Sequence, residues 1–228
     1  MGGLVFLYVP DVDAWYAEIT GRGIKTQSPL KELKGRTKNV RVIDPDGNKL
    51  DICTRLSQLS FTSTGDLEII PSKTSSPNDF DFFIGRWKIY NKKLKTRLNN
   101  CTEWLEFEAT NECHSILNGF GNTDQFITEF DGVPFQGATF RLFNPKTRLW
   151  SLYWADSNVV VLDVPQVGSF DGNIGRFYAK DVFAGKPIIV LFQWDKTNPE
   201  VPIWSQAFSP DNGKTWEWNW YMTFYRQS

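Results

Sequence analysis

The chain contains few of the residues that build disulfide frameworks, metal centres and nucleophilic active sites. Its 228 residues include 3 Cys, 2 Met and 1 His. Cys53, Cys101 and Cys113 leave one thiol over and show no CxxC spacing, so neither a disulfide framework nor a zinc knuckle is indicated. With His114 as the single histidine and no G-x-S-x-G elbow, a serine or cysteine hydrolase has no strong candidate. We expect a reducing, intracellular setting and lean against an enzyme.

An excess of charge and a long apolar run are also lacking. The 25 basic and 26 acidic side chains give a net charge of -1, which argues against a nucleic-acid-binding surface. No uninterrupted apolar run approaches the roughly 20 residues of a transmembrane helix. The apolar stretch that starts at Leu4 has no basic region before it and is too short for a signal peptide. The sequence therefore predicts a cytoplasmic protein without nucleic-acid or membrane partners.

Aromatic residues are abundant instead, and they are unevenly distributed. There are 10 Trp, 7 Tyr and 18 Phe, of which five lie in residues 1–77 and thirty in residues 78–228. This division implies two different cores. Between them, residues 56–79 are rich in Ser, Thr and Pro without sustained periodicity, as linkers are. We predict a first domain over 1–55, a linker over 56–79 and a second domain over 80–228.

The first domain is predicted to be a small α+β unit. Residues 4–9 are apolar and β-prone, and Asp11 precedes a stretch with helical spacing that ends at Gly21. Strands over 39–43 and 49–54 flank a tight turn of Asp, Pro, Gly and Asn residues. The order is therefore a strand, a helix and further strands.

Two stretches of this domain, LYVPDVDAWYAEITGRGI and RVIDPDGNKLDI, resemble one βαβββ module of the glyoxalase/bleomycin-resistance (vicinal oxygen chelate) superfamily. The resemblance implies paired modules around a divalent metal, bound by a His or Gln on the first strand and a Glu on the last. Here apolar residues stand around Leu4 to Phe6, and Asp51 stands where the Glu would be. A hard cation needs several convergent ligands. We therefore predict no metal site, with Asp51 as a weak candidate.

Only one such module is present, so one face of its sheet lacks the usual partner module. Three arrangements are open. Two chains complete each other in a homodimer, the half module packs on the second domain, or the chain is a truncated form of something longer. The homodimer leads to an alternative function, a metal-dependent vicinal-oxygen-chelate enzyme (a lyase or a dioxygenase) with Asp51 as a ligand.

The second domain is predicted to be all β. Its residues alternate with period two between turn signals such as Asn118-Gly119 and Asp131-Gly132. The expected strands lie near residues 84–93, 103–113, 121–130, 135–143, 148–155, 158–164, 175–182, 186–194, 202–208 and 215–226. The fold class is therefore mainly β, with an antiparallel lipocalin-like β-barrel of about ten strands after a small α+β βαβββ half module.

Alternation along the strands predicts which side chains point into the barrel. In the last strand the even-numbered residues from Trp216 to Phe224 share one face, which we expect to be the inner one. By the same test Phe140 points inward and Arg141 outward. The residues expected to bind a ligand are Phe107, Phe126, Phe140, Trp154, Phe192, Trp218, Trp220, Met222 and Phe224.

The stretch FDFFIGRWKIYNKKLK contains Gly85-x-Trp87, a pattern that resembles the first strand of calycins, the lipocalin and fatty-acid-binding superfamily. The resemblance implies a basic residue near the end of the last strand, packed over that Trp, and Arg226 stands there. Because a guanidinium over an indole combines cation–π attraction with hydrogen bonding, Gly85, Trp87 and Arg226 are expected to close one end of the barrel. Together with LFNPKTRLWSLYWAD and AFSPDNGKTWEWNWYMTFYR, the domain further resembles a lipocalin-like family of uncharacterised, mainly bacterial proteins, which implies no assigned activity.

Four other features have two interpretations each. Ser209 to Trp216 match the Asp-box of sialidases, but a single copy indicates a hairpin brace. His114 is expected at a rim or in a loop, although ten-stranded nitrobindin-like barrels bind haem through a histidine. The basic run Lys88 to Arg97 is either a solvated strand end or a contact for an anionic ligand group at the barrel mouth. Asp156 either points inward or caps the following turn.

The leading functional hypothesis is binding of a small hydrophobic or aromatic molecule inside the calycin-like barrel, without a cofactor. Aromatic side chains bury large areas with few rotamers, which suits a lined cavity. The alternatives are the metal-dependent enzyme, a haem-binding nitrobindin-like protein, and a structural barrel whose rings leave no cavity. The interior volume separates the first hypothesis from the last.

Overall fold

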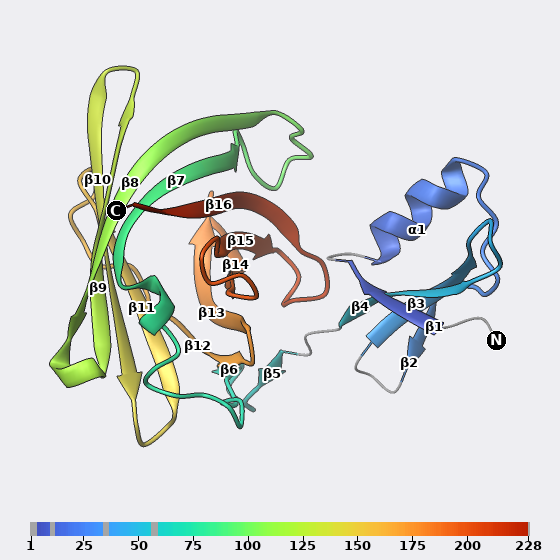
Figure 1. The fold of residues 1–228 in the computed structure, drawn as a ribbon, viewed down its shortest axis with the longest axis horizontal. Helices are drawn as coiled ribbons and strands as arrows, with labels where there is room; N and C mark the ends of the chain where they lie inside the picture. The colour runs from blue at the N-terminus through green and yellow to red at the C-terminus, as the bar shows by residue number, and fades with distance from the viewer. Residues whose placement is uncertain (1–3, 10–11, 34–36, 56–58, 228) are drawn as a thin grey trace. The chain divides into compact units, whose positions relative to one another are not determined.

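The computed structural model describes residues 4–9, 12–33, 37–55 and 59–227. Its contacts divide the chain into two compact units, residues 1–59 and residues 60–228. Strands predominate in both units (Figure 1). Within the described residues, no helix combines the length and the apolar character that a membrane crossing requires.

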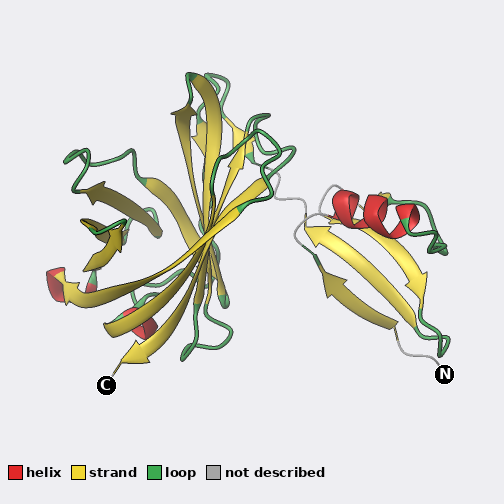
Figure 2. Ribbon diagram, turned by 90° about the horizontal axis from the view of Figure 1, so that it is seen from above, coloured by secondary structure: helices red, strands yellow, loops and turns green. Residues whose placement is uncertain are grey.

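The first unit is a four-stranded sheet with one helix. Its elements are β1 (Leu4–Tyr8), α1 (Val12–Gly21), β2 (Lys31–Leu33), β3 (Thr37–Ile43) and β4 (Lys49–Arg55). The sheet order is β1-β4-β3-β2, with β1 parallel to β4 and the other pairs antiparallel. The helix covers one face of the sheet (Figure 2). The core between them consists of Val12, Ile19, Val40, Val42 and Ile52.

The second unit is a closed barrel of ten antiparallel strands, which confirms the predicted fold class. The strands are β7 (Gly85–Leu94), β8 (Trp104–Ile116), β9 (Gly121–Phe130), β10 (Val133–Asn144), β11 (Leu149–Asp156), β12 (Gln166–Asp171), β13 (Ile174–Phe183), β14 (Lys186–Asp195), β15 (Ile203–Ser209) and β16 (Glu217–Gln227). Each strand pairs with the next along the chain, and β16 pairs with β7, so the barrel has no free edge.

Successive connections alternate between the two ends of such a barrel. The end where β7 begins is called the closed end here, because the 3-10 helix η1 (Asp81–Phe83) and its neighbours fill it with rings. Phe80, Phe83, Trp87 and Trp194 are all buried there. The opposite, open end carries the connections over 95–103, 131–132, 157–165, 184–185 and 210–216.

Residues 60–83 also belong to the second unit. A hairpin of β5 (Ser60–Phe61) and β6 (Leu67–Glu68) comes first, and Lys180 donates a hydrogen bond to the Gly65 carbonyl. Further on, the backbone N–H of Ser72 donates to Ser169, at 2.9 Å. The Ser75 hydroxyl donates to the Arg148 carbonyl, at 2.7 Å. These bonds hold the segment against β12, β13 and the connection between β10 and β11.

The expected strand over 158–164 is wrong, and β12 begins only at Gln166. The Asp156 carboxylate accepts hydrogen bonds from the backbone N–H groups of Asn158 and Val159, which turns the chain instead of extending it. The connection that results exposes Val159, Val160, Val161, Leu162 and Val164. β-Branched residues suggested a strand, but the local turn at Asp156 overrides that preference.

Val160 carries backbone strain in this connection. Its φ is 56°, a left-handed value that a β-branched residue rarely adopts, and its side chain is 79% exposed. We expect Val160→Asn to raise the free energy of unfolding by about 1 kcal/mol, because Asn tolerates this conformation and no burial is lost. Chemical denaturation measures the change. The control is Val159→Asn, since Val159 is also exposed but has a negative φ. A gain of equal size in the control would contradict the strain.

The Asp-box stretch is a hairpin brace. The Asp211 carboxylate accepts hydrogen bonds from the Ser209 hydroxyl and from the Thr215 backbone N–H, both at 2.8 Å. The Ser209 hydroxyl in turn accepts from the backbone N–H of Gly213. These bonds satisfy backbone groups of the β15–β16 connection, as expected for this turn chemistry.

Candidate functional site

The barrel encloses a cavity of about 240 Å³, called the interior cavity here. A second space of about 230 Å³, the mouth space, shares Lys93, Phe126, Trp154 and Trp220 with it. Aromatic side chains therefore line the barrel without filling it. This volume argues against the alternative of a structural barrel with no cavity.

Six of the nine predicted ligand-binding residues line the interior cavity. They are Phe126, Trp154, Phe192, Trp220, Met222 and Phe224. The Trp154 ring packs on Gly137 of the neighbouring strand, where a Cβ atom would stand 2.0 Å from the ring. Gly137 therefore leaves the space in which the Trp154 indole reaches into the cavity. The three other predicted residues, Phe107, Phe140 and Trp218, lie elsewhere.

Phe140 lies on the outer face of β10, with 41% of its surface exposed, and the prediction that Arg141 points outward is wrong. Arg141 is buried and lines the cavity together with Thr139. Its guanidinium forms an ion pair with Asp124 on the neighbouring strand β9. An unpaired buried charge is costly, so the carboxylate of Asp124 accounts for the inward position of Arg141.

Trp218 is displaced from the cavity by a bulge. The register between β15 and β16 shifts between Gln206 and Ala207, so Trp218 no longer shares a face with Trp220. Its ring stacks instead on that of Tyr221, at 6.3 Å between centroids. The bulged residue Asn219 is fully buried and accepts a hydrogen bond from Gln206, which lines the cavity.

Phe107 is the third predicted residue outside the cavity lining. It is half-buried at the edge of the aromatic core, and its ring packs edge to face on that of Phe130, 4.9 Å away. Phe130 belongs to the mouth space. Phe107 therefore packs against a side chain that lines the mouth space, but it does not line the interior cavity itself.

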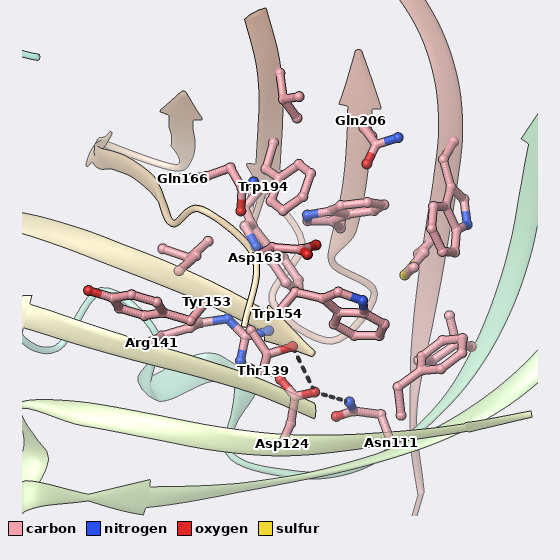
Figure 3. A pocket seen from close by; sticks show the side chains of 18 of the residues that line it. Asn111, Asp124, Thr139, Arg141, Tyr153, Trp154, Asp163, Gln166, Trp194 and Gln206 are labelled. Atoms are coloured by element: carbon pink, nitrogen blue, oxygen red, sulfur yellow. Dashed lines mark hydrogen bonds and ion pairs between the residues drawn. The ribbon is translucent and has the colours of Figure 1, made fainter. Parts of the chain in front are cut away.

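A buried polar network occupies the cavity wall toward the closed end (Figure 3). Asp124 accepts hydrogen bonds from Asn111 at 2.7 Å and from Thr139 at 3.2 Å, in addition to its ion pair with Arg141. Arg141 also donates to Asn122, at 2.9 Å. Its guanidinium lies over the Phe83 ring, 4.9 Å from the centroid, and near those of Phe80 and Trp194. Sequence alternation alone did not reveal this network.

Several buried polar atoms around the cavity have no hydrogen-bond partner within the described residues. They are Arg97 Nε, Asn111 Oδ1, Arg141 Nε, Gln166 Oε1 and Trp194 Nε1, and all five residues line the interior cavity. Buried polar groups are normally hydrogen-bonded to protein or to water. These five atoms have almost no accessible surface, so they lie within the wall of the cavity and not at its surface.

Two cations lie in the cavity wall toward the open end. Lys93 is on the inward face of β7, and its ammonium lies 3.9 Å from the centre of the Trp220 ring. Burial, together with the nearby charge of Arg97, lowers the pKa of Lys93 to about 8. Burial also lowers the pKa of Arg97, whose guanidinium lies over the Phe208 ring. Both residues belong to the basic run that the sequence singled out.

Acidic side chains line the cavity at other positions. Asp163 and Asp181 belong to the lining, and burial, with the charges of Asp181 and Asp156, raises the pKa of Asp163. Asp156 lies in the mouth space and accepts hydrogen bonds from Trp154 Nε1 and from the turn that follows it. Both interpretations of Asp156 therefore apply, because it caps the turn while facing the mouth.

The structure brings Gly85, Trp87 and Arg226 together at the closed end. The Arg226 guanidinium lies 4.3 Å from the Trp87 ring centre and donates to the carbonyls of Phe82 and Ile84, at 2.8 and 3.0 Å. Gly85 has a φ of 119°, and a Cβ atom there would stand 3.0 Å from Arg226. Trp87 is fully buried and donates to the Phe83 carbonyl, at 2.7 Å.

The remaining candidates for chemistry lie outside the cavity or are already paired. His114 is on the outer face of β8, with its side chain 66% exposed beside Glu112, so the haem alternative has no histidine inside the barrel. Asp51 is buried, and both of its oxygens accept from Arg41, at 2.6 and 2.7 Å. Burial raises the pKa of Cys113 to about 12, which keeps the thiol neutral. No cluster of three or more potential metal ligands occurs in the described part of the chain.

Neither a family model nor a curated protein sequence matches the chain. Among solved structures, it is similar to the S-type phycobiliprotein lyase CPES from Guillardia theta. The TM-score is 0.48 and the identity 11%, over 68% of this chain and 94% of that one. At this level of similarity, the site has to be judged from its own residues.

Proposed function

We propose that the barrel binds a small molecule with an aromatic or apolar body in its interior cavity. The observation that carries the proposal is an interior space of about 240 Å³ whose walls include Phe126, Trp154, Phe192 and Trp220. Preformed cavities with mostly apolar walls and a few convergent polar groups are typical ligand sites. An apolar cavity of about 150 Å³ already holds benzene, so this one has room for one or two fused rings.

Polar side chains among the rings refine the proposal. Lys93, Asp163 and Gln206 line the interior cavity together with the aromatic residues. Ligand sites usually combine apolar walls with a few polar groups that orient the ligand. We therefore expect an amphipathic ligand, which narrows the earlier hypothesis of a simply hydrophobic one.

Filling the cavity provides the direct test. Val190 lines the interior cavity, and we expect Val190→Phe to weaken binding of the probe 2-naphthamide at least about tenfold, since the added ring occupies the probe's space. Isothermal titration calorimetry measures the dissociation constant. The control is Val182→Phe, which makes the same change on an outward side chain that is 64% exposed. Equal affinity in both variants, or no binding by the native chain, would contradict an interior site.

Pairing of half modules between two chains stays a prediction. It would cover the face of the sheet opposite α1, on which Asp51 and Arg41 form their ion pair. Native mass spectrometry of the protein purified from cells reports the oligomeric mass and any retained small molecule in one measurement. A monomeric mass across the micromolar range would contradict the homodimer.

A further inference from the structure

Lys93 differs from the other lysines of its segment in having no anionic partner. Lys88, Lys92 and Lys95 point outward and pair with Glu108, Glu106 and Glu103 across the β7–β8 hairpin. Lys93 points into the barrel, and within the described residues its ammonium forms no hydrogen bond or ion pair. The face of the Trp220 ring attracts it closely, and the charge of Asp156 acts on it across the mouth space. A half-buried ammonium with this environment is poorly compensated for its lost hydration.

Arg97 adds a second under-compensated cation beside it. Its Nε atom is buried without a partner, and within the described residues no carboxylate lies within ion-pair distance of its guanidinium. The two charges are close enough for Arg97 to lower the pKa of Lys93. The nearest acidic groups are engaged elsewhere. Glu217 accepts two hydrogen bonds from the backbone N–H of Leu98, and Asp156 accepts from Trp154 and its own turn.

The remaining acidic groups of the lining stand on the far wall. Asp163 precedes β12 and Asp181 lies in β13, and these strands lie five and four positions around the barrel from β7. The open end therefore has a cationic wall on the β7 side and an acidic wall opposite. A negatively charged group that enters is attracted to the first wall and repelled by the second.

We propose that the ligand of the barrel is an aromatic or apolar monoanion whose carboxylate is bound by Lys93 and Arg97. This inference rests on the proposed binding function and names its ligand class. The carboxylate would accept hydrogen bonds from the Lys93 ammonium and from Arg97. Its apolar body would lie between Phe126, Trp154 and Trp220, the rings that the interior cavity and the mouth space share.

A matched pair of probes tests the carboxylate directly. 2-Naphthoate and 2-naphthamide have nearly the same shape but differ in charge. At pH 7 we expect the native chain to bind 2-naphthoate about tenfold or more tightly than 2-naphthamide, because a charge-assisted hydrogen bond is stronger than a neutral one. Lys93→Met is expected to abolish that preference while binding of 2-naphthamide persists. Calorimetric titration reports both affinities for each variant.

Lys92→Met is the control, because it removes the adjacent charge on the outer face of the same strand. The preference for 2-naphthoate should survive in it. Since the pKa of Lys93 is about 8 in the free barrel, affinity for 2-naphthoate should fall above that pH, whereas affinity for 2-naphthamide should not. The other charged groups that face this space are Arg97, Asp156, Asp163 and Asp181.

The titrations separate the anion site from the binding site as a whole. Binding of both probes with equal affinity, or a preference that Lys93→Met leaves intact, would overturn the anion site while the interior cavity stands as a binding site. Failure of the native chain to bind either probe would overturn the proposed function together with this inference. Thermal unfolding of each variant establishes that the comparison is made on folded protein.

Discussion

Replacing Asp124 with alanine is expected to lower the free energy of unfolding by about 3–5 kcal/mol, because it leaves the charge of Arg141 buried and unpaired. Both side chains are almost fully buried in the barrel. Asn111 and Thr139 would also lose the carboxylate to which they donate. Urea denaturation followed by tryptophan fluorescence measures the loss. It is one of the two largest effects that we expect from a single substitution in this chain.

Two further variants distinguish the lost pairing from a general packing defect. Asp124→Leu combined with Arg141→Met removes both charges, and we expect the double variant to be clearly more stable than Asp124→Ala alone. Glu108→Ala removes the carboxylate of the exposed ion pair with Lys88, and its effect should be much smaller. A double variant as unstable as the single one would show that packing, not charge, decides the loss.

Much of the barrel could be predicted because its strands follow a simple rule. Side chains alternate between the two faces, and glycine-rich turns separate the strands, so nine of ten strands were placed within a few residues. In the first unit, β1, α1, β3 and β4 follow from equally local signals, namely apolar runs, helical spacing and turn residues. Local signals fail where one residue redirects the chain. The turn at Asp156 converts an apolar β-branched stretch into an exposed connection.

Which side chains point into the cavity was less predictable than where the strands lie. In β10 the choice between the faces of Phe140 and Arg141 depends on Asp124, which is distant in sequence. In β16 a one-residue bulge moves Trp218 out of the cavity, and nothing in the local alternation marks it. The inward position of Lys93 could have been predicted from the sequence, because alternation along β7 puts it on the same face as Trp87 and Ile89.

Trp87 is the residue on which the closed end depends most. Its indole is fully buried, stacks on Phe83 at 5.6 Å and 14°, and supports the Arg226 guanidinium. We expect Trp87→Ala to lower the free energy of unfolding by about 3–5 kcal/mol, through lost burial and the cavity that remains. Trp87→Phe keeps a ring but leaves the Phe83 carbonyl without its donor, so a loss of about 1–3 kcal/mol is expected.

Trp218→Ala is the matched control for this substitution. Trp218 stacks on Tyr221 and is only partly buried, whereas Trp87 is fully buried. The same change from tryptophan to alanine should therefore cost clearly less there than at position 87, when both are measured by urea denaturation. Equal losses at the two positions would contradict the bulge in β16, since Trp218 would then have to be a core residue like Trp87.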